Sequence, residues 1–145
     1  SREDAMIVLE PAHLREIVSD CERAFPDEAC GLLVGRWTGE VARVSEVHAS
    51  GNVAENPRRA FEVEPRLLLA LHKRLRQGED TLLGVYHSHP DSAALPSAHD
   101  LNRAWQPEMI WLITTVRDGR AVETTAHWLA DGAFVPLPLA LEAAL

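Results

Sequence analysis

The stretch TLLGVYHSHP, residues 81–90, places a run of apolar residues directly before two histidines. Its first part, Thr81–His87, has the length of a strand and is hydrophobic enough to be buried on both faces of a sheet. His87 and His89 are two residues apart, so their imidazoles project from the same side of the chain. The stretch therefore predicts a buried strand that presents two nitrogen ligands at its end.

Apolar periodicity and turn residues on either side of this strand predict the other elements. Further strands are expected at Met6–Leu9, Cys30–Trp37, Val41–Val47, Met109–Val116 and Ala121–Leu129, with shorter ones at Ala60–Val63 and after the turn at Asp131-Gly132. Helices are expected to begin at Pro11, Pro65 and Ser97 and to run to Phe25, to near Gly78 and toward Trp105. The apolar tail from Pro136 to Leu145 is expected to form a helix that packs on the domain or on a partner.

Helices that alternate with strand hairpins predict an α/β protein of the α+β type. Its sheet is expected to be mixed, mostly antiparallel and flanked by helices. A length of 145 residues predicts a single domain over residues 1–145. Ser1 is not an initiator residue, so residues 1–5 are expected to include a cloning remnant, with Met6 as a candidate native start.

The composition is that of an acidic globular protein. Hydrophobic residues make up 46% of the chain, which excludes a disordered class. The net charge of −8 disfavours a nucleic-acid partner, and the longest apolar runs are too short to span a membrane. No leader resembles a signal peptide, and Cys21 and Cys30 form no C-x-x-C pair. A reduced, cytoplasmic setting is therefore expected.

The histidine pair continues into a longer pattern, H-x-H-x7-S-x-x-D, which adds Ser97 and Asp100. Asp100, in the first turn of an expected helix, can serve as a third ligand beside His87 and His89. Two imidazoles and one carboxylate leave a position open on a tetrahedral zinc ion, as in catalytic rather than structural zinc sites. The spacing from Ser97 to Asp100 also fits a helix capping box, which requires no catalysis, and the two interpretations are compatible.

Other zinc hydrolase patterns do not match this chain. The H-x-H-x-D-H pattern of metallo-β-lactamases requires a histidine at position 92, where Ser92 stands. Nucleobase deaminases require P-C-x-x-C, and neither of the two cysteines lies in that pattern. An H-E-x-x-H pattern is also absent from the sequence.

A hydrolase that activates water needs a general base, and Glu28 is the best candidate. It lies just before the expected strand at Cys30, and a neighbouring strand could bring it beside the histidines. Non-catalytic roles are expected for the other candidate residues. Cys21 and Cys30 are expected to be small buried residues, and Trp105 and Trp111 core residues. His127 is expected to be structural, His99 to lie at the rim of the site, and Asn52 and Asn56 to be turn residues rather than substrate-contacting donors.

Three segments together resemble the JAMM (MPN+) metallopeptidases, most closely their short stand-alone prokaryotic members. They are PDEACGLLVG at residues 26–35, YHSHP at residues 86–90 and PSAHDL at residues 96–101. The resemblance spans nearly the whole chain, and no key position of the composite motif departs from the family pattern. It implies a curved sheet in an MPN domain that resembles the cytidine-deaminase-like architecture, and it disfavours the metal-free MPN scaffolds.

The resemblance also implies a role for each site residue. His87, His89 and Asp100 would bind one zinc ion. Glu28 would activate the zinc-bound water and pass a proton to the leaving amine, and Ser97 would stabilise the developing oxyanion. The substrate would be a peptide or isopeptide bond after the C-terminal Gly-Gly of a ubiquitin-like or sulfur-carrier β-grasp protein, because a tail without side chains fits a narrow groove beside a strand edge.

Two alternative functions fit the same residues. One is a zinc hydrolase of small amides, and the other is a module that binds such carrier proteins without turnover. The leaving group stays open between a lysine side chain, a cysteine and a peptide. The tail from Phe134 to Leu145 could also support a homodimer.

Overall fold

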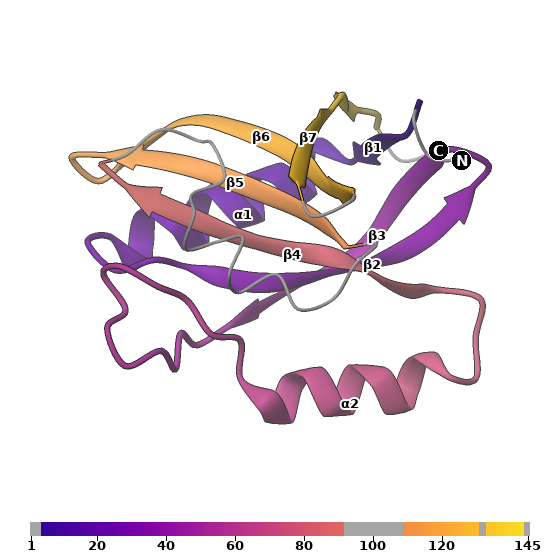
Figure 1. The fold of residues 1–145 in the computed structure, drawn as a ribbon, viewed down its shortest axis with the longest axis horizontal. Coiled ribbons are helices and arrows are strands. Elements are labelled where there is room, and N and C mark those ends of the chain that lie inside the picture. Colours follow the sequence, from indigo (N-terminus) through magenta and orange to yellow (C-terminus); the bar gives the residue numbers. More distant parts are fainter. Residues whose placement is uncertain (1–3, 92–108, 131–132, 144–145) are drawn as a thin grey trace.

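The computed structural model describes residues 4–91, 109–130 and 133–143. These residues form two helices and eight strands (Figure 1). The helices are α1 (Pro11–Ala24) and α2 (Pro65–Leu75). The strands are β1 (Met6–Leu9), β2 (Cys30–Thr38), β3 (Val41–Ser50), β4 (Thr81–Pro90), β5 (Ile110–Arg117), β6 (Arg120–Ala130), β7 (Ala133–Leu137) and β8 (Leu139–Leu141).

Local chemistry accounts for most of these boundaries. Both helices carry a proline in their first turn, where the missing N–H would have no partner within the helix. Helix α1 ends before the Phe25-Pro26 pair, which cannot continue a helix. The β5–β6 hairpin turns at Asp118 and Gly119, both with positive φ, as a two-residue Asp-Gly turn requires.

All eight strands belong to one sheet in the order β7-β6-β5-β4-β2-β3-β1-β8. Strand β4 lies between antiparallel β2 and parallel β5, so it is central, and antiparallel pairs outnumber parallel ones across the sheet. Strands β7 and β8 stand at opposite ends of this order, yet only Pro138 separates them in the chain. The sheet therefore curves until it nearly closes on itself, and the predicted mixed, mostly antiparallel sheet is confirmed.

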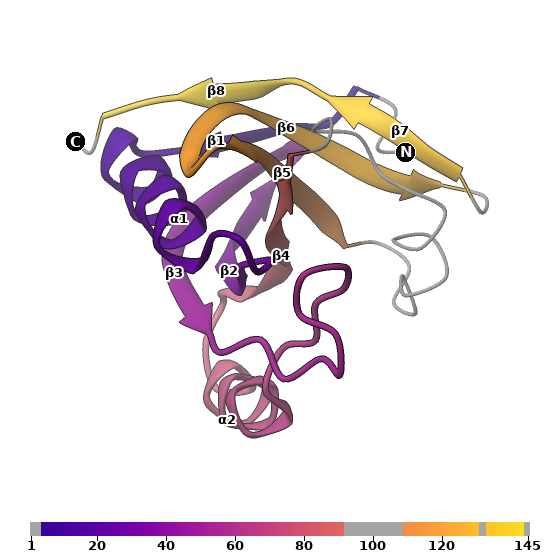
Figure 2. The same cartoon turned by 90° about the vertical axis from the view of Figure 1, so that its left-hand side faces the viewer.

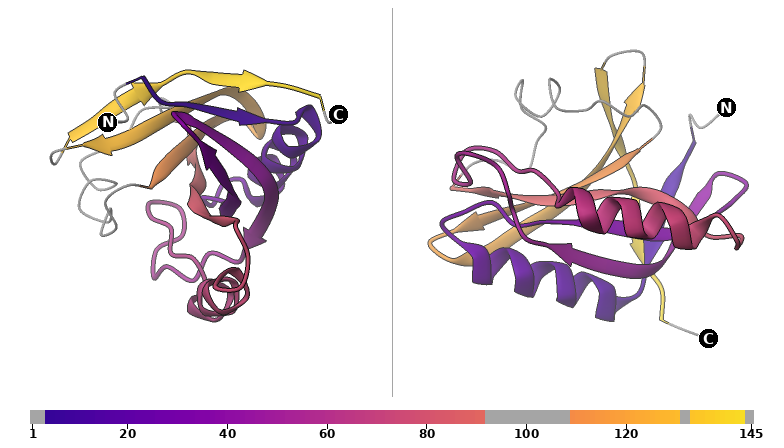
Figure 3. Two further views of the ribbon diagram at one scale, coloured as in Figure 1. Left: turned by 90° about the vertical axis from the view of Figure 1, so that its right-hand side faces the viewer. Right: turned by 90° about the horizontal axis from the view of Figure 1, so that it is seen from below.

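The two helices lie on opposite faces of this curved sheet (Figure 2). Helix α1 lies inside the curve, and its Ile17 and Cys21 side chains are fully buried there. Helix α2 lies outside the curve and packs through Leu71 on the side chains of Leu32 and Val34 (Figure 3). None of the described helices is long and apolar enough to cross a membrane.

Two local predictions need correction. Over its described residues, 136–143, the tail does not form a helix: it forms the end of β7 and strand β8, which pairs in parallel with β1. Pro138 joins these strands, its carbonyl accepts the N–H of Ile7, and no helix interior would accommodate Pro136 and Pro138. The short strand expected at Ala60–Val63 is reduced to a single bridge between Asn52 and Val63.

Candidate active site

The two histidines lie at the carboxyl end of β4 and face away from α1. His87 is fully buried, and His89 is 7% exposed. Their ring centroids are 4.9 Å apart, as expected for side chains two residues apart on the same face of a strand. Both side chains can therefore reach a common point beside the sheet, as the spacing predicted.

Strand pairing brings Glu28 to the same point. Strand β2 runs antiparallel to β4 with Cys30 opposite His87, so the residues before Cys30 reach the end of β4. Between the two histidines, Ser88 fixes this end of the ladder: its Oγ accepts the N–H of Ala29 at 2.8 Å, and its own N–H donates to the Ala29 carbonyl at 3.1 Å. The Glu28 carboxylate then lies 3.3 Å from Nδ1 of His87.

The three side chains form a compact donor group for a metal ion. One ligand atom from each of Glu28, His87 and His89 lies within 4.8 Å of the others, and all three residues are buried. Imidazole nitrogens with a carboxylate oxygen suit zinc and related divalent ions. A buried carboxylate beside two imidazoles is costly to desolvate unless a cation or proton compensates it, so the described residues fit a metal ion.

Two aromatic side chains, Phe61 and Trp111, contact the His87 ring. Phe61 stacks on the imidazole with a centroid distance of 4.4 Å and an interplanar angle of 17°. Trp111 meets the same ring edge to face at 5.5 Å, and Phe134 of β7 packs against Trp111. Trp111 is buried as predicted, whereas the place of Phe61 was not predicted, because only the path of residues 51–64 brings it over β4.

Asn52 organises the segment that carries Phe61. Its side chain bonds only to main-chain atoms in the described contacts, at Glu28, Pro57 and Ala60 as acceptors and at Ala54 and Glu62 as donors. Asn52 therefore has a structural role in this loop, and it stands in a bridge with Val63 rather than in a turn. Its contact with Glu28 was not predicted, since the only signal was an Asn after the Ser50-Gly51 pair.

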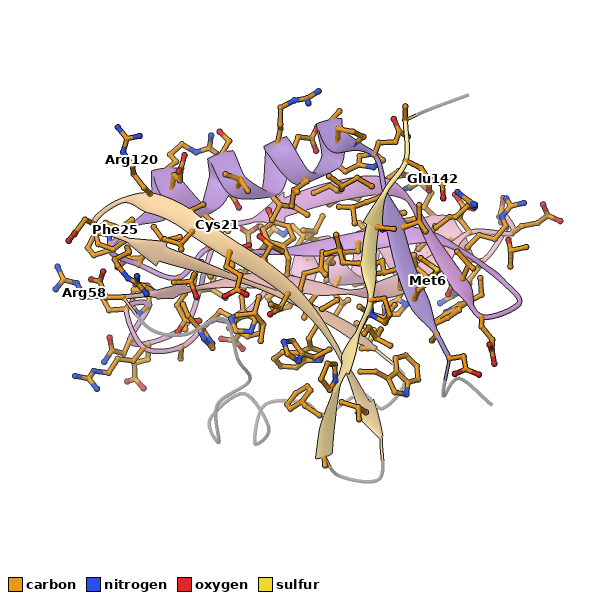
Figure 4. All side chains as sticks on the ribbon, turned by 90° about the horizontal axis from the view of Figure 1, so that it is seen from above. Met6, Cys21, Phe25, Arg58, Arg120 and Glu142 are labelled. Carbon is orange, nitrogen blue, oxygen red and sulfur yellow. The ribbon has the colours of Figure 1, made fainter. Side chains whose placement is uncertain are left out.

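The two cysteine thiols are buried and unsuited to nucleophilic catalysis. Burial raises the pKa of Cys30 to about 12, and its Sγ lies 3.8 Å from the carbonyl oxygen of Gly51. Burial likewise raises the pKa of Cys21 to about 12, where the thiol points from α1 toward the sheet (Figure 4). His127 is also structural, with its Nε2 at 2.8 Å from Oγ1 of Thr125.

Four residues singled out in the sequence lie outside the described residues. They are Ser97, His99, Asp100 and Trp105. The geometry above therefore comprises Glu28, His87 and His89 of the predicted site, which the β2–β4 ladder brings together.

Comparison with known proteins places this geometry in a family. A family model described as prokaryotic homologs of the JAB domain matches residues 10–130, which include both β2 and β4. A protein named desampylase from Haloferax volcanii is 37% identical over 117 residues, covering 81% of this chain and 80% of that protein. A CysO-cysteine peptidase from Mycobacterium tuberculosis is 25% identical over 134 residues, covering 92% and 90%.

A solved structure agrees with these matches. The solution structure of a Desulfitobacterium hafniense protein superposes with a TM-score of 0.84 at 30% identity, covering 97% of this chain and 95% of that one. The relatives with curated names are peptidases and desampylases, which are hydrolytic enzymes, and the resemblance to short prokaryotic JAMM proteins is confirmed. The chain belongs to the family of prokaryotic homologs of the JAB domain, and it is a hydrolytic enzyme of that family.

Proposed function

We propose that the chain is a zinc-dependent peptidase that hydrolyses the bond after the C-terminal Gly-Gly of a ubiquitin-like or sulfur-carrier protein. The observation that carries the proposal is the buried group of Glu28, His87 and His89, with ligand atoms within 4.8 Å of one another. Because catalytic zinc sites combine three protein ligands with an open position, two histidines and one further carboxylate complete such a site.

His87, His89 and Asp100 would hold the zinc ion. When bound, zinc supplies Lewis-acid polarisation of the scissile carbonyl and lowers the pKa of a coordinated solvent molecule toward neutrality. Phe61 and Trp111 hold the His87 imidazole in one orientation, so little reorganisation of this ligand would be needed on metal binding. Trp111 and Phe61 exclude bulk water from the back of the His87 ring.

Glu28 would act as the general base and then as the general acid. Its carboxylate stands beside the two imidazoles, and its main chain is fixed at both the N–H and the carbonyl. Glu28 would accept a proton from the attacking water and deliver it to the leaving amine. Ser97 would donate a hydrogen bond to the oxyanion that develops on the scissile carbonyl.

The names of the relatives support the substrate class. One relative is named a CysO-cysteine peptidase, and a Thermus thermophilus relative, 38% identical over 91 residues, is named a probable TtuB-protein conjugate cleaving protease. A Gly-Gly tail is suited to a narrow site because its residues lack side chains. The leaving amine is proposed to be a lysine side chain, a cysteine or a peptide.

The experiment that tests this function is cleavage of a sulfur-carrier protein whose Gly-Gly terminus is fused to a short peptide. We expect cutting after the second glycine with zinc present, and loss of cutting with a chelator. Glu28→Gln should lower kcat by about a thousandfold, since one positioned base contributes 10²–10⁴-fold. Glu55→Gln, a matched change at an exposed glutamate, should leave cutting unchanged.

Zinc content distinguishes the base from the ligands. Glu28→Gln is expected to retain one zinc ion per chain, whereas Asp100→Asn is expected to lose it. Loss of zinc from Glu28→Gln would instead make Glu28 the third ligand. A fully loaded enzyme that cuts no carrier fusion but cuts dipeptides would support hydrolysis of small amides, and one that binds carriers without cutting anything would support a binding module.

A further inference from the structure

The Asn52 side chain fills its hydrogen-bonding capacity with main-chain partners. Its Nδ2 donates to the carbonyl oxygens of Glu28 and Ala60, each at 2.9 Å, and has a longer contact of 3.4 Å with that of Pro57. Its Oδ1 accepts the N–H groups of Ala54 and Glu62, each at 3.0 Å. An amide offers two donors and two acceptor sites, so this side chain is held in one orientation.

Two of these bonds bracket Phe61. Ala60 and Glu62 are its immediate neighbours in sequence, and both are bonded to Asn52. The bridge between Asn52 and Val63 and the bond from Val53 N–H to the Glu62 carbonyl fix the same backbone. Phe61 then has its ring against the imidazole of His87 at a centroid distance of 4.4 Å.

The same segment fixes the main chain of Glu28. The Glu28 N–H donates to the Pro57 carbonyl at 2.7 Å, and its own carbonyl accepts from Asn52. Glu28 precedes β2, so these two bonds add to the β2–β4 ladder in placing its carboxylate beside His87. Asn52 thus lies at the junction between Glu28 and the ring that covers His87.

We propose that Asn52 is a positioning residue. Its amide side chain fixes both the main chain of Glu28 and the segment that places Phe61 on His87, and it thereby fixes the Glu28 carboxylate relative to the His87 imidazole. Its role in seating Phe61 on His87 is independent of the chemistry, whereas its effect on turnover rests on the function proposed for Glu28. A displacement of about 1 Å at a reacting group can cost about a hundredfold in rate, so a loosened segment should be visible in kcat.

The test is Asn52→Asp, which keeps the shape and the acceptor but replaces the Nδ2 donor with a carboxylate oxygen facing two carbonyls. Ring currents from Phe61 and Trp111 should shift the resonances of the His87 ring protons away from their random-coil positions in the NMR spectrum of the metal-free protein. In Asn52→Asp we expect these resonances to move toward random-coil positions. Asn56→Asp makes the same chemical change at an exposed position of the same segment and should leave them unchanged.

Kinetics of the zinc-loaded protein provide the second readout. We expect Asn52→Asp to lower kcat by about 10 to 100-fold with KM within about twofold and zinc content unchanged. Equal losses in kcat for Asn52→Asp and Asn56→Asp, or unchanged His87 resonances in Asn52→Asp, would overturn the proposal. If Asn52→Asp does not fold, Asn52→Ser removes the forked amide without adding charge and decides the same comparison.

The NMR readout separates this proposal from the proposed function. If the wild-type enzyme cuts neither carrier fusions nor small amides, the function proposed for Glu28 fails. The His87 resonances of the metal-free variants would still show whether Asn52 holds Phe61 against the His87 ring. Phe61→Leu, which leaves the Asn52 bonds in place, should shift the same resonances and thereby confirm their assignment to the stack.

Discussion

The two faces of strand β4 carry polar residues that have opposite uses. Tyr86 and Ser88 face α1, and each has a fixed partner: the Tyr86 hydroxyl donates to Asp20 at 2.7 Å, and Ser88 bonds to the main chain of Ala29. His87 and His89, the alternating residues, face the segment that carries Phe61 and lie beside Glu28. One strand thus holds a structural hydrogen-bond pair on one face and a donor group for a metal ion on the other.

The two faces of β4 separate residues that stabilise the fold from residues of the candidate active site. On the α1 face, burial and the Asp20 carboxylate raise the pKa of Tyr86 far above its ordinary range, so the phenol stays a neutral donor. Gly31 makes room for this ring, since a Cβ at that position would lie 2.2 Å from Tyr86 Cε2. Changes on this face should therefore affect unfolding, and changes on the His87 face should affect turnover.

The largest expected effect comes from His87→Asn. Removing one imidazole from the donor group should abolish stoichiometric zinc binding and lower kcat/KM by at least about a thousandfold, equivalent to about 4 kcal/mol of transition-state stabilisation. The zinc content of the purified protein and the cleavage of a carrier fusion measure both effects.

His87→Asn should leave the stability of the metal-free fold largely intact. The free energy of unfolding of the metal-free protein should fall by less than about 2 kcal/mol, because the strand pairing of β4 is unchanged. A chemical denaturation series with a chelator measures it. Wild-type zinc content in the variant would remove His87 from the metal site.

On the α1 side of β4, Ile17→Ala should have the opposite effect: it should lower the stability of the fold and leave turnover nearly unchanged. Ile17 is fully buried between α1 and the sheet, and truncating such a side chain costs about 2–5 kcal/mol of stability. Cleavage at 25 °C should stay within about twofold while the folded fraction remains high. Ser19→Ala, at an exposed position of the same helix, should change stability by less than about 0.5 kcal/mol. A loss of zinc in folded Ile17→Ala would show that the two faces are coupled.

Local signals in the sequence predicted most of the fold. The prediction that failed, at β8, concerns an element that depends on contacts with a distant part of the chain. The proline starts of α1 and α2, the Asp118-Gly119 hairpin and the apolar run of β4 each depend on neighbouring residues alone. Strand β8 depends on pairing with β1, about the whole chain length away, so an apolar tail without that partner was expected to be helical. Length and apolarity alone do not distinguish a short buried strand from a helix.

The same distinction applies to the site. The H-x-H spacing fixed the relative placement of His87 and His89 because it uses only the two-residue period of a strand. Glu28 was tied to them by its position before β2 and by the family motif, and the antiparallel register of Cys30 against His87 supplies the physical link. Phe61 and Asn52 carry no comparable signal, since an irregular segment brings them to the site.

The smallest expected effect concerns the thiol beneath α1. Cys21 is fully buried, and burial raises its pKa from 9.0 to about 12. An acid with a raised pKa in the folded state stays protonated while the unfolded chain ionises, so its contribution is complete below pH 9 and is lost as the pH rises toward 12. At pH 10 the loss should be about 1.4 kcal/mol, because one pH unit separates this condition from the unfolded pKa.

Comparison of wild type with Cys21→Ala isolates this contribution. The free energy of unfolding, measured by denaturant at intervals from pH 8 to pH 10.5, should fall less steeply in the variant, whatever its stability at pH 8. The difference in slope cancels other groups that titrate in this range, Tyr86 included, because both proteins retain them. Parallel pH profiles would show that the Cys21 thiol is reached by solvent, and the α1 face would then be less tightly closed than its packing indicates.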